Sequence, residues 1–163
     1  MAMRVACLGL ALCALFVCGT PAGAADKAAQ LEQQYQKERN PRKRSEIARK
    51  LLLQRFEALR TRIGTGVMLE ESSPELNQYQ RGVELLANAV REAAHHKTSK
   101  DAEKSLRDQE KELSNLKMLV SAAEHRYLDR LLQAVGALKE ELLYGLYKLS
   151  PATETPADEV SRR

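Results

Sequence analysis

A stretch of 49 residues without proline, from Asp101 to Leu149, constrains the fold of this chain more than any other feature. Apolar residues recur through it mostly at steps of three and four, the spacing that places side chains on one face of a helix. It therefore predicts one helix of about 49 residues, ~73 Å long at 1.5 Å per residue. Gly136 and Gly145 weaken the prediction of continuity, because each costs about 1 kcal/mol relative to alanine in a helix. The recurring residues are Leu106, Leu113, Leu116, Val120, Ala123, Tyr127, Leu131, Val135, Leu138, Leu142, Leu146 and Leu149.

Three shorter helices are predicted before this stretch. The first covers residues 26–39, and the second runs from about Pro41 to Ile63, where Gly64 supplies a stop. The third begins at Ser72 and Ser73, whose hydroxyls suit a helix start, and continues to about residue 97. The shortest turn that fits then joins it to the long helix at residues 98–100.

The predicted fold is all-α, an elongated antiparallel hairpin or bundle of three to four helices. Only 4% of the residues are aromatic, and the composition is that of long helices rather than of a β-sandwich or an α/β core. A helix of ~73 Å is about twice the diameter of a compact domain of this size. The second and third helices are expected to run end to end beside it, with a thin tip near residues 95–101. The alternative places them side by side.

Residues 1–24 predict a cleaved secretory signal peptide. Val5 to Val17 is almost wholly apolar, and Pro21 and small residues follow it. The alternative is an uncleaved anchor, although the run is shorter than the ~20 apolar residues that span a bilayer. The three cysteines, Cys7, Cys13 and Cys18, all fall in this segment, so the mature chain has no disulfide and no thiol nucleophile. The expected location is extracytoplasmic, either a bacterial periplasm or the medium.

The rest of the chain is expected to form one helical domain, residues 25–149, followed by a disordered tail. The tail, residues 150–163, has two prolines and no apolar periodicity.

One stretch has the spacing of metal ligands, Glu92-Ala93-Ala94-His95. Residues three apart share a helix face, and Glu-x-x-His serves di-iron sites in helical bundles. Such a site needs two of these motifs and two further glutamates, whereas the chain has one motif. A metal-dependent bundle enzyme is therefore the least favoured alternative, and no catalytic residue, cofactor or small-molecule substrate is inferred.

Residues 37–62, from the end of the first predicted helix through the kink at Pro41 and the second predicted helix, carry ten lysines and arginines against three glutamates. Such a segment could bind anionic lipid headgroups or an acidic wall polymer by salt-sensitive attraction. Nucleic acid is not expected, because aromatic residues do not alternate with the cations. The alternative is a solvated face whose charges pair with acids elsewhere in the fold. The candidate anion-binding residues are Arg42, Lys43, Arg44, Arg49 and Lys50.

The narrow first part of the long helix supplies the candidate partner-binding residues, Leu106, Leu113 and Leu116. In a thin two-helix tip these leucines would be half covered, which favours dimerisation or capture of another helix. The chain is therefore expected to be an exported, non-enzymatic interaction protein of the cell envelope: an adaptor, a chaperone-like holder or a spacer. Its expected partner is another protein or a second copy of itself.

Overall fold

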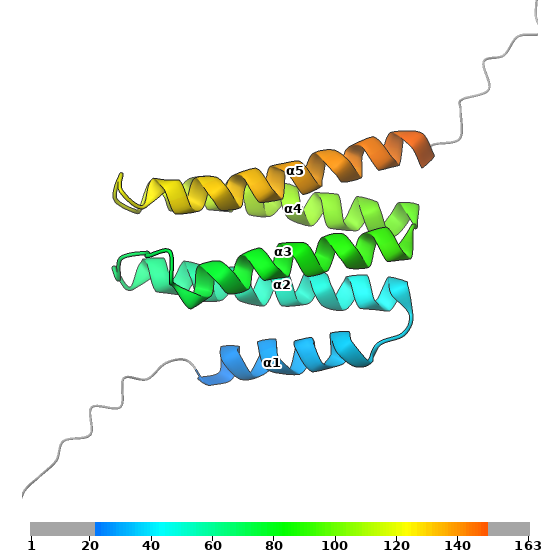
Figure 1. Ribbon diagram of the computed structural model, residues 1–163, viewed down its shortest axis with the longest axis horizontal. Helices are drawn as coiled ribbons and strands as arrows, with labels where there is room; N and C mark the ends of the chain where they lie inside the picture. Colours follow the sequence, from blue (N-terminus) through cyan, green and yellow to red (C-terminus); the bar gives the residue numbers. More distant parts are fainter. Residues whose placement is uncertain (1–21, 150–163) are drawn as a thin grey trace, which may run out of the picture.

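The computed structural model describes residues 22–149, which form five α-helices and no strand (Figure 1). The prediction of an all-α chain is confirmed. The predicted signal peptide lies outside the described residues except for its last three, where the first helix begins, and the predicted tail lies outside them entirely. The helices are α1 (Ala22–Lys37), α2 (Pro41–Gly64), α3 (Pro74–Ala93), α4 (His96–Lys117) and α5 (His125–Leu149).

The helices form three layers, and each runs antiparallel to the one before it (Figure 1). α1 is one outer layer, the α2–α3 hairpin is the middle layer, and the α4–α5 hairpin is the other outer layer. α2 packs mainly on α3, and α4 mainly on α5. The single helix α1 packs on α2, and its Tyr35 hydroxyl also donates a hydrogen bond of 3.4 Å to the Leu85 carbonyl of α3.

The predicted helix of about 49 residues is wrong. The chain leaves the helix at Met118 and enters α5 at His125, so that α4 and α5 lie side by side. Within this connection the Glu124 carboxylate accepts the Ser121 N–H over 2.9 Å. This is half of a capping box, which satisfies a donor that a new helix end leaves free. The longest helix, α5, has 25 residues and is ~37 Å long.

The end-to-end arrangement of the second and third helices is also wrong, since α2 and α3 pack side by side, as in the alternative. Asn40 begins α2 by accepting hydrogen bonds from the Arg42 and Lys43 N–H groups over 3.0 and 3.4 Å. Ala94 ends α3 in the left-handed conformation, at φ 42°. This residue turns the chain into α4 within two positions, so the third helix is shorter than expected.

The apolar faces of all five helices meet in one core. Leu106 and Leu113 are fully buried and Leu116 is 5% exposed. The expectation that these leucines are half covered is wrong, because α4 packs on α5 and also on α2 and α3. A polar contact crosses this core, where the Tyr79 hydroxyl donates to Gln109 Oε1 over 2.5 Å. Burial raises the pKa of Tyr79, so its hydroxyl remains a donor.

Gly82 marks the closest approach of α3 to α2. A Cβ atom at this position would lie 3.0 Å from Leu52 Cδ1 and 3.3 Å from Arg55 Cδ. We expect Gly82→Ala to be overpacked, and overpacking commonly destabilises a core by about 1–3 kcal/mol. Gly145→Ala is the matched control, because no atom lies within 4 Å of a Cβ there.

The control substitution should raise the free energy of unfolding by up to about 1 kcal/mol through helix propensity alone. Urea unfolding followed by circular dichroism measures both variants. The free energy of unfolding of Gly82→Ala should be about 1–3 kcal/mol lower than that of Gly145→Ala. Equal stability of the two variants would contradict the close packing of α3 on α2.

Candidate functional site

The two connections at one end of the bundle expose a group of large apolar side chains. One connection joins α2 to α3, and the other joins α4 to α5; both lie at the left of Figure 1. Single exposed apolar residues are common on proteins, whereas several at one end of a bundle form a candidate binding surface. Here the group is called the apolar tip: Val67, Met68, Met118 and Leu119, which are 48%, 63%, 83% and 73% exposed.

The carboxylate of Glu124 joins the two connections that carry the apolar tip. Its Oε1 accepts a 2.7 Å hydrogen bond from the N–H of Leu69, in the α2–α3 connection. Its Oε2 accepts from the Ser121 N–H and hydroxyl, over 2.9 and 2.5 Å. Glu124 is 7% exposed. The Ser121 hydroxyl, and after it the Leu69 and Ser121 N–H groups, lower the pKa of this carboxyl.

Two ion pairs join the same parts of the chain. Arg130 of α5 pairs with Glu71 over 2.8 Å, and Lys117 of α4 pairs with Asp129 of α5 over 2.6 Å. These charges neutralise one another, so they add no net charge beside the tip.

The structure divides the basic segment into paired and unpaired residues. Arg44 pairs with Glu92 of α3 over 2.9 Å and also lies 4.6 Å from the centre of the Tyr35 ring. Arg55 pairs with Glu32 of α1 over 2.9 Å. For these arginines the alternative interpretation, charges that pair within the fold, describes the structure. Arg42, Lys43, Arg49 and Lys50 make no ion pair with any residue from 26 to 148.

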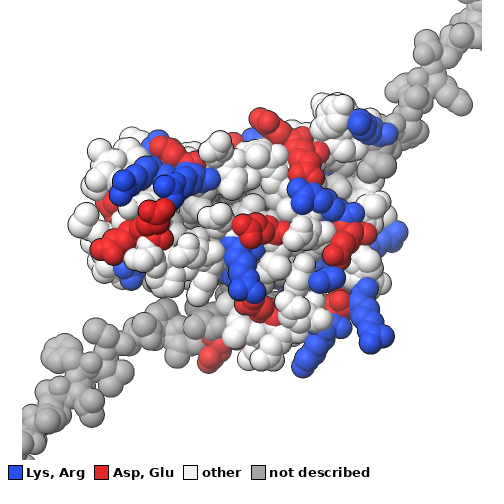
Figure 2. Space-filling view, in the orientation of Figure 1, with Lys and Arg blue, Asp and Glu red and all other residues white. Residues whose placement is uncertain are grey.

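An open pocket of about 220 Å³ lies between the first turns of α2 and α4. Helix α2 contributes Arg42 and Arg49 to it, and the start of α4 contributes Lys97. Lys43 and Lys50 are not part of its lining. Figure 2 shows lysine and arginine side chains gathered at the lower right, over the connection between α1 and α2. The structure therefore brings two of the five predicted anion-binding residues together with a lysine from another helix.

Glu92 and His95 do not form the predicted helical pair. Helix α3 ends at Ala93, and the left-handed Ala94 separates the two residues. Glu92 is bonded to Arg44, while His95 lies at the start of α4. In the part of the chain that the structure describes, no group of three or more His, Cys, Asp or Glu residues could hold a metal ion.

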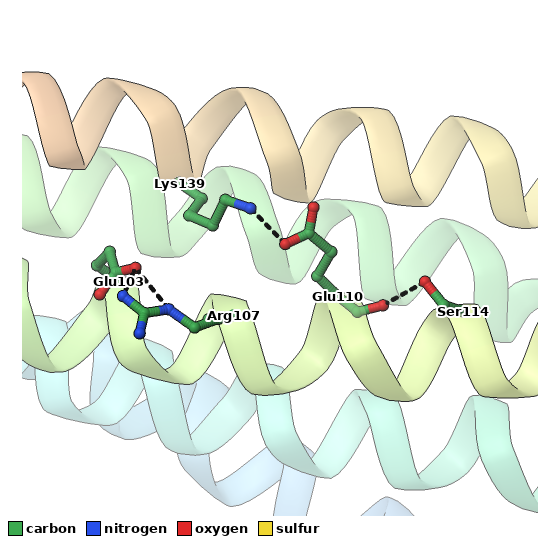
Figure 3. A network of polar contacts seen from close by, with 5 residues as sticks. All are labelled: Glu103, Arg107, Glu110, Ser114 and Lys139. Carbon is green, nitrogen blue, oxygen red and sulfur yellow. Dashed lines mark hydrogen bonds and ion pairs between the residues drawn. The ribbon is translucent and has the colours of Figure 1, made fainter.

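The seam between α4 and α5 carries polar contacts on its outer side (Figure 3). Lys139 of α5 points toward Glu110 of α4 and forms an ion pair with it. A Cβ at Gly136 would lie 3.8 Å from Glu110 Oε1, an ordinary contact distance, so this carboxylate does not require a glycine there. On α4 itself, Arg107 pairs with Glu103 over 2.6 Å. The Lys139–Glu110 pair therefore joins α5 to α4, whereas the Arg107–Glu103 pair lies within α4.

Glu124 was not predicted from the sequence, although a local signal was present. Ser121-Ala122-Ala123-Glu124 has the Ser-x-x-Glu spacing of a capping box, which predicts a helix start. No such signal existed for the pocket, because its residues come from segments about 50 positions apart.

Comparisons with protein-family models, with curated proteins and with solved structures give no match to this chain. Within residues 22–149, no helix has both the length and the apolar character needed to cross a bilayer. The proposals below therefore depend on the geometry of the chain itself.

We predict that Glu124→Gln destabilises the fold by about 1.5–3 kcal/mol, because an amide cannot accept all three hydrogen bonds and leaves a donor unpaired. Thermal or urea unfolding at pH 7 measures the loss. Glu71→Gln, which removes an exposed carboxylate from the neighbouring connection, is the control and should change stability much less.

The difference in stability between the wild type and Glu124→Gln should depend on pH. A carboxyl with a lowered pKa in the folded chain stabilises the fold above its unfolded pKa, and this stabilisation is lost as the pH falls through the folded pKa. The difference between wild type and Glu124→Gln should be full at pH 7 and should shrink as the pH falls below 4.5, the ordinary glutamate value. A difference that is constant from pH 7 to pH 3 would contradict the role of Glu124.

Proposed function

We propose that this chain is an exported, non-enzymatic interaction protein of the cell envelope that binds a protein partner, or a second copy of itself, through the apolar tip. The observation that carries the proposal is the exposure of Val67, Met68, Met118 and Leu119 at one end of the bundle. Export rests on the apolar segment and small residues within residues 1–24.

The tip suits binding because its side chains are apolar while the backbone beneath them is fixed. Glu124 holds both connections, so the tip loses little conformational freedom when a partner covers it. Methionine adapts its shape to different apolar surfaces, which fits an adaptor or a holder of several clients. The leucine stripe of α4 is less suitable, since Leu106 and Leu113 are already buried.

Replacement of two tip residues tests this proposal. We expect Met118→Ser with Leu119→Ser to lower capture of the partner by about tenfold, because central apolar residues of an interface often contribute over 1 kcal/mol each. The measurement is a crosslinking pull-down from the native envelope with the tagged chain lacking residues 1–24, together with light scattering for self-association.

Tyr144→Ser with Tyr147→Ser is the matched control, because these residues of α5 are 65% and 79% exposed and lie toward the opposite end of the bundle. Circular dichroism confirms that both variants fold. Equal capture by wild type and both variants would contradict binding through the tip.

A second candidate function is peripheral binding to an anionic membrane or wall polymer through the start of α2. The supporting observation is that Arg42, Lys43, Arg49 and Lys50 have no acidic partner among the described residues, whereas Arg44 does. Unpaired cations remain available to an anionic surface, and each lysine or arginine near such a surface contributes about 1 kcal/mol.

We expect the chain to sediment with vesicles that contain phosphatidylglycerol at low salt and to be released by salt. Replacing Arg42, Lys43, Arg49 and Lys50 with glutamine should abolish this association. The control replaces four cations of other helices with glutamine and so removes the same net charge. These cations, all in ion pairs, are Arg91, Arg107, Lys117 and Arg130. Equal losses in both variants would show that only the net charge matters and would contradict a binding face on α2.

A further inference from the structure

We infer that the pocket between the starts of α2 and α4 binds a single phosphate group. This inference deepens the second candidate function, the anionic surface of α2, and gives that surface one defined site. The same chemistry occurs in a lipid headgroup and in a free phosphate compound, and the experiment below distinguishes these two sources.

The two arginines of the pocket lie on one face of α2. Arg42 and Arg49 are seven residues apart, which is almost two full turns, so their side chains leave the helix in nearly the same direction. Neither arginine has an ion-pair partner within residues 26–148. The planar guanidinium group matches phosphate oxygens with two parallel hydrogen bonds, so a pair of unpaired arginines in a pocket is suited to this anion.

Helix α4 adds donors from the other side of the pocket. Lys97 lines it, and so does His95, whose Nδ1 atom is buried without a hydrogen-bond partner in the described structure. Buried polar atoms are normally paired, so an unpaired one in a pocket wall indicates a ligand or a water. At this helix start no side chain caps the free N–H groups, whereas Asn40 caps those of α2.

The charge and the volume of the pocket suit one small anionic group. The lining contains three cations, Arg42, Arg49 and Lys97, and two carboxylates, Glu46 and Asp101, so these five side chains have a net charge of +1. The volume of about 220 Å³ equals the share of about seven water molecules in the liquid, which is enough for one phosphate and its first ester atoms.

Nuclear magnetic resonance of the chain lacking residues 1–24, titrated with inorganic phosphate at constant ionic strength, tests the site. The resonances of the His95 ring and of the Lys97 and Thr98 amides should shift and reach saturation. Arg42→Gln with Arg49→Gln should weaken this binding by about tenfold or more, because each substitution removes charged hydrogen bonds to the anion. The amide spectrum shows whether the variant is folded.

Lys43→Gln with Lys50→Gln is the matched control. It removes the same charge from the same helix, at residues that are also seven apart but lie outside the pocket lining. This variant should change phosphate affinity by less than about twofold, since at an ionic strength of about 0.15 M exposed charges are screened beyond about 8 Å. Equal weakening in both double variants would overturn the phosphate site and leave the broader anionic surface standing. Absence of saturable shifts at His95, Lys97 and Thr98 in the wild type would also overturn it, whatever the vesicle result.

Vesicles of phosphatidylglycerol then identify the source of the phosphate. Two results together support a headgroup in the pocket. Inorganic phosphate releases the chain from the vesicles, and the double variant Arg42→Gln with Arg49→Gln loses vesicle binding while the control variant keeps it. Saturable phosphate binding with unchanged vesicle association in that variant supports a free phosphate compound.

Discussion

The buried carboxylate of Glu124 holds together the two connections that form the turns of the α2–α3 and α4–α5 hairpins. It accepts one hydrogen bond from the α2–α3 connection and two from Ser121, just before α5. The two bonds from Ser121 hold the turn that leads into α5, and α5 packs back on α4. A continuous helix would instead carry Leu131 and Val135 beyond the reach of α3, whose apolar face α5 covers.

Helical periodicity predicts which residues face the core, yet it carries no information about a reversal of the chain. The apolar steps continue on both sides of residues 118–124, because both α4 and α5 have to bury one face. Breaks with a strong local cause were predicted well: Asn40-Pro41 starts α2, and Pro74 starts α3. The break at Ser121 has neither proline nor glycine, so it was visible only as a capping box.

The candidate sites were harder to predict, because exposure and charge pairing depend on which helices become neighbours. Leu106 has the same spacing whether a helix covers it or leaves it free, and in the structure it is fully buried. Arg44 finds its acid 48 positions away, while Arg42, two residues earlier, finds none. The sequence therefore predicted a basic segment from its charge. The packing of α2 against α3 and α4 decides which of its residues pair with acids and which line the pocket.

The apolar tip and the proposed phosphate pocket lie at opposite ends of α2, which runs from Pro41 near the pocket to Gly64 near the tip. Its 24 residues separate them by ~36 Å. Substitutions this far apart should act independently, so the tests of the two sites do not confound each other. The separation also has a functional consequence. A chain held at an anionic surface by the pocket end would present its tip about 36 Å away, and confinement to that surface would raise the effective concentration of the tip for a partner anchored there.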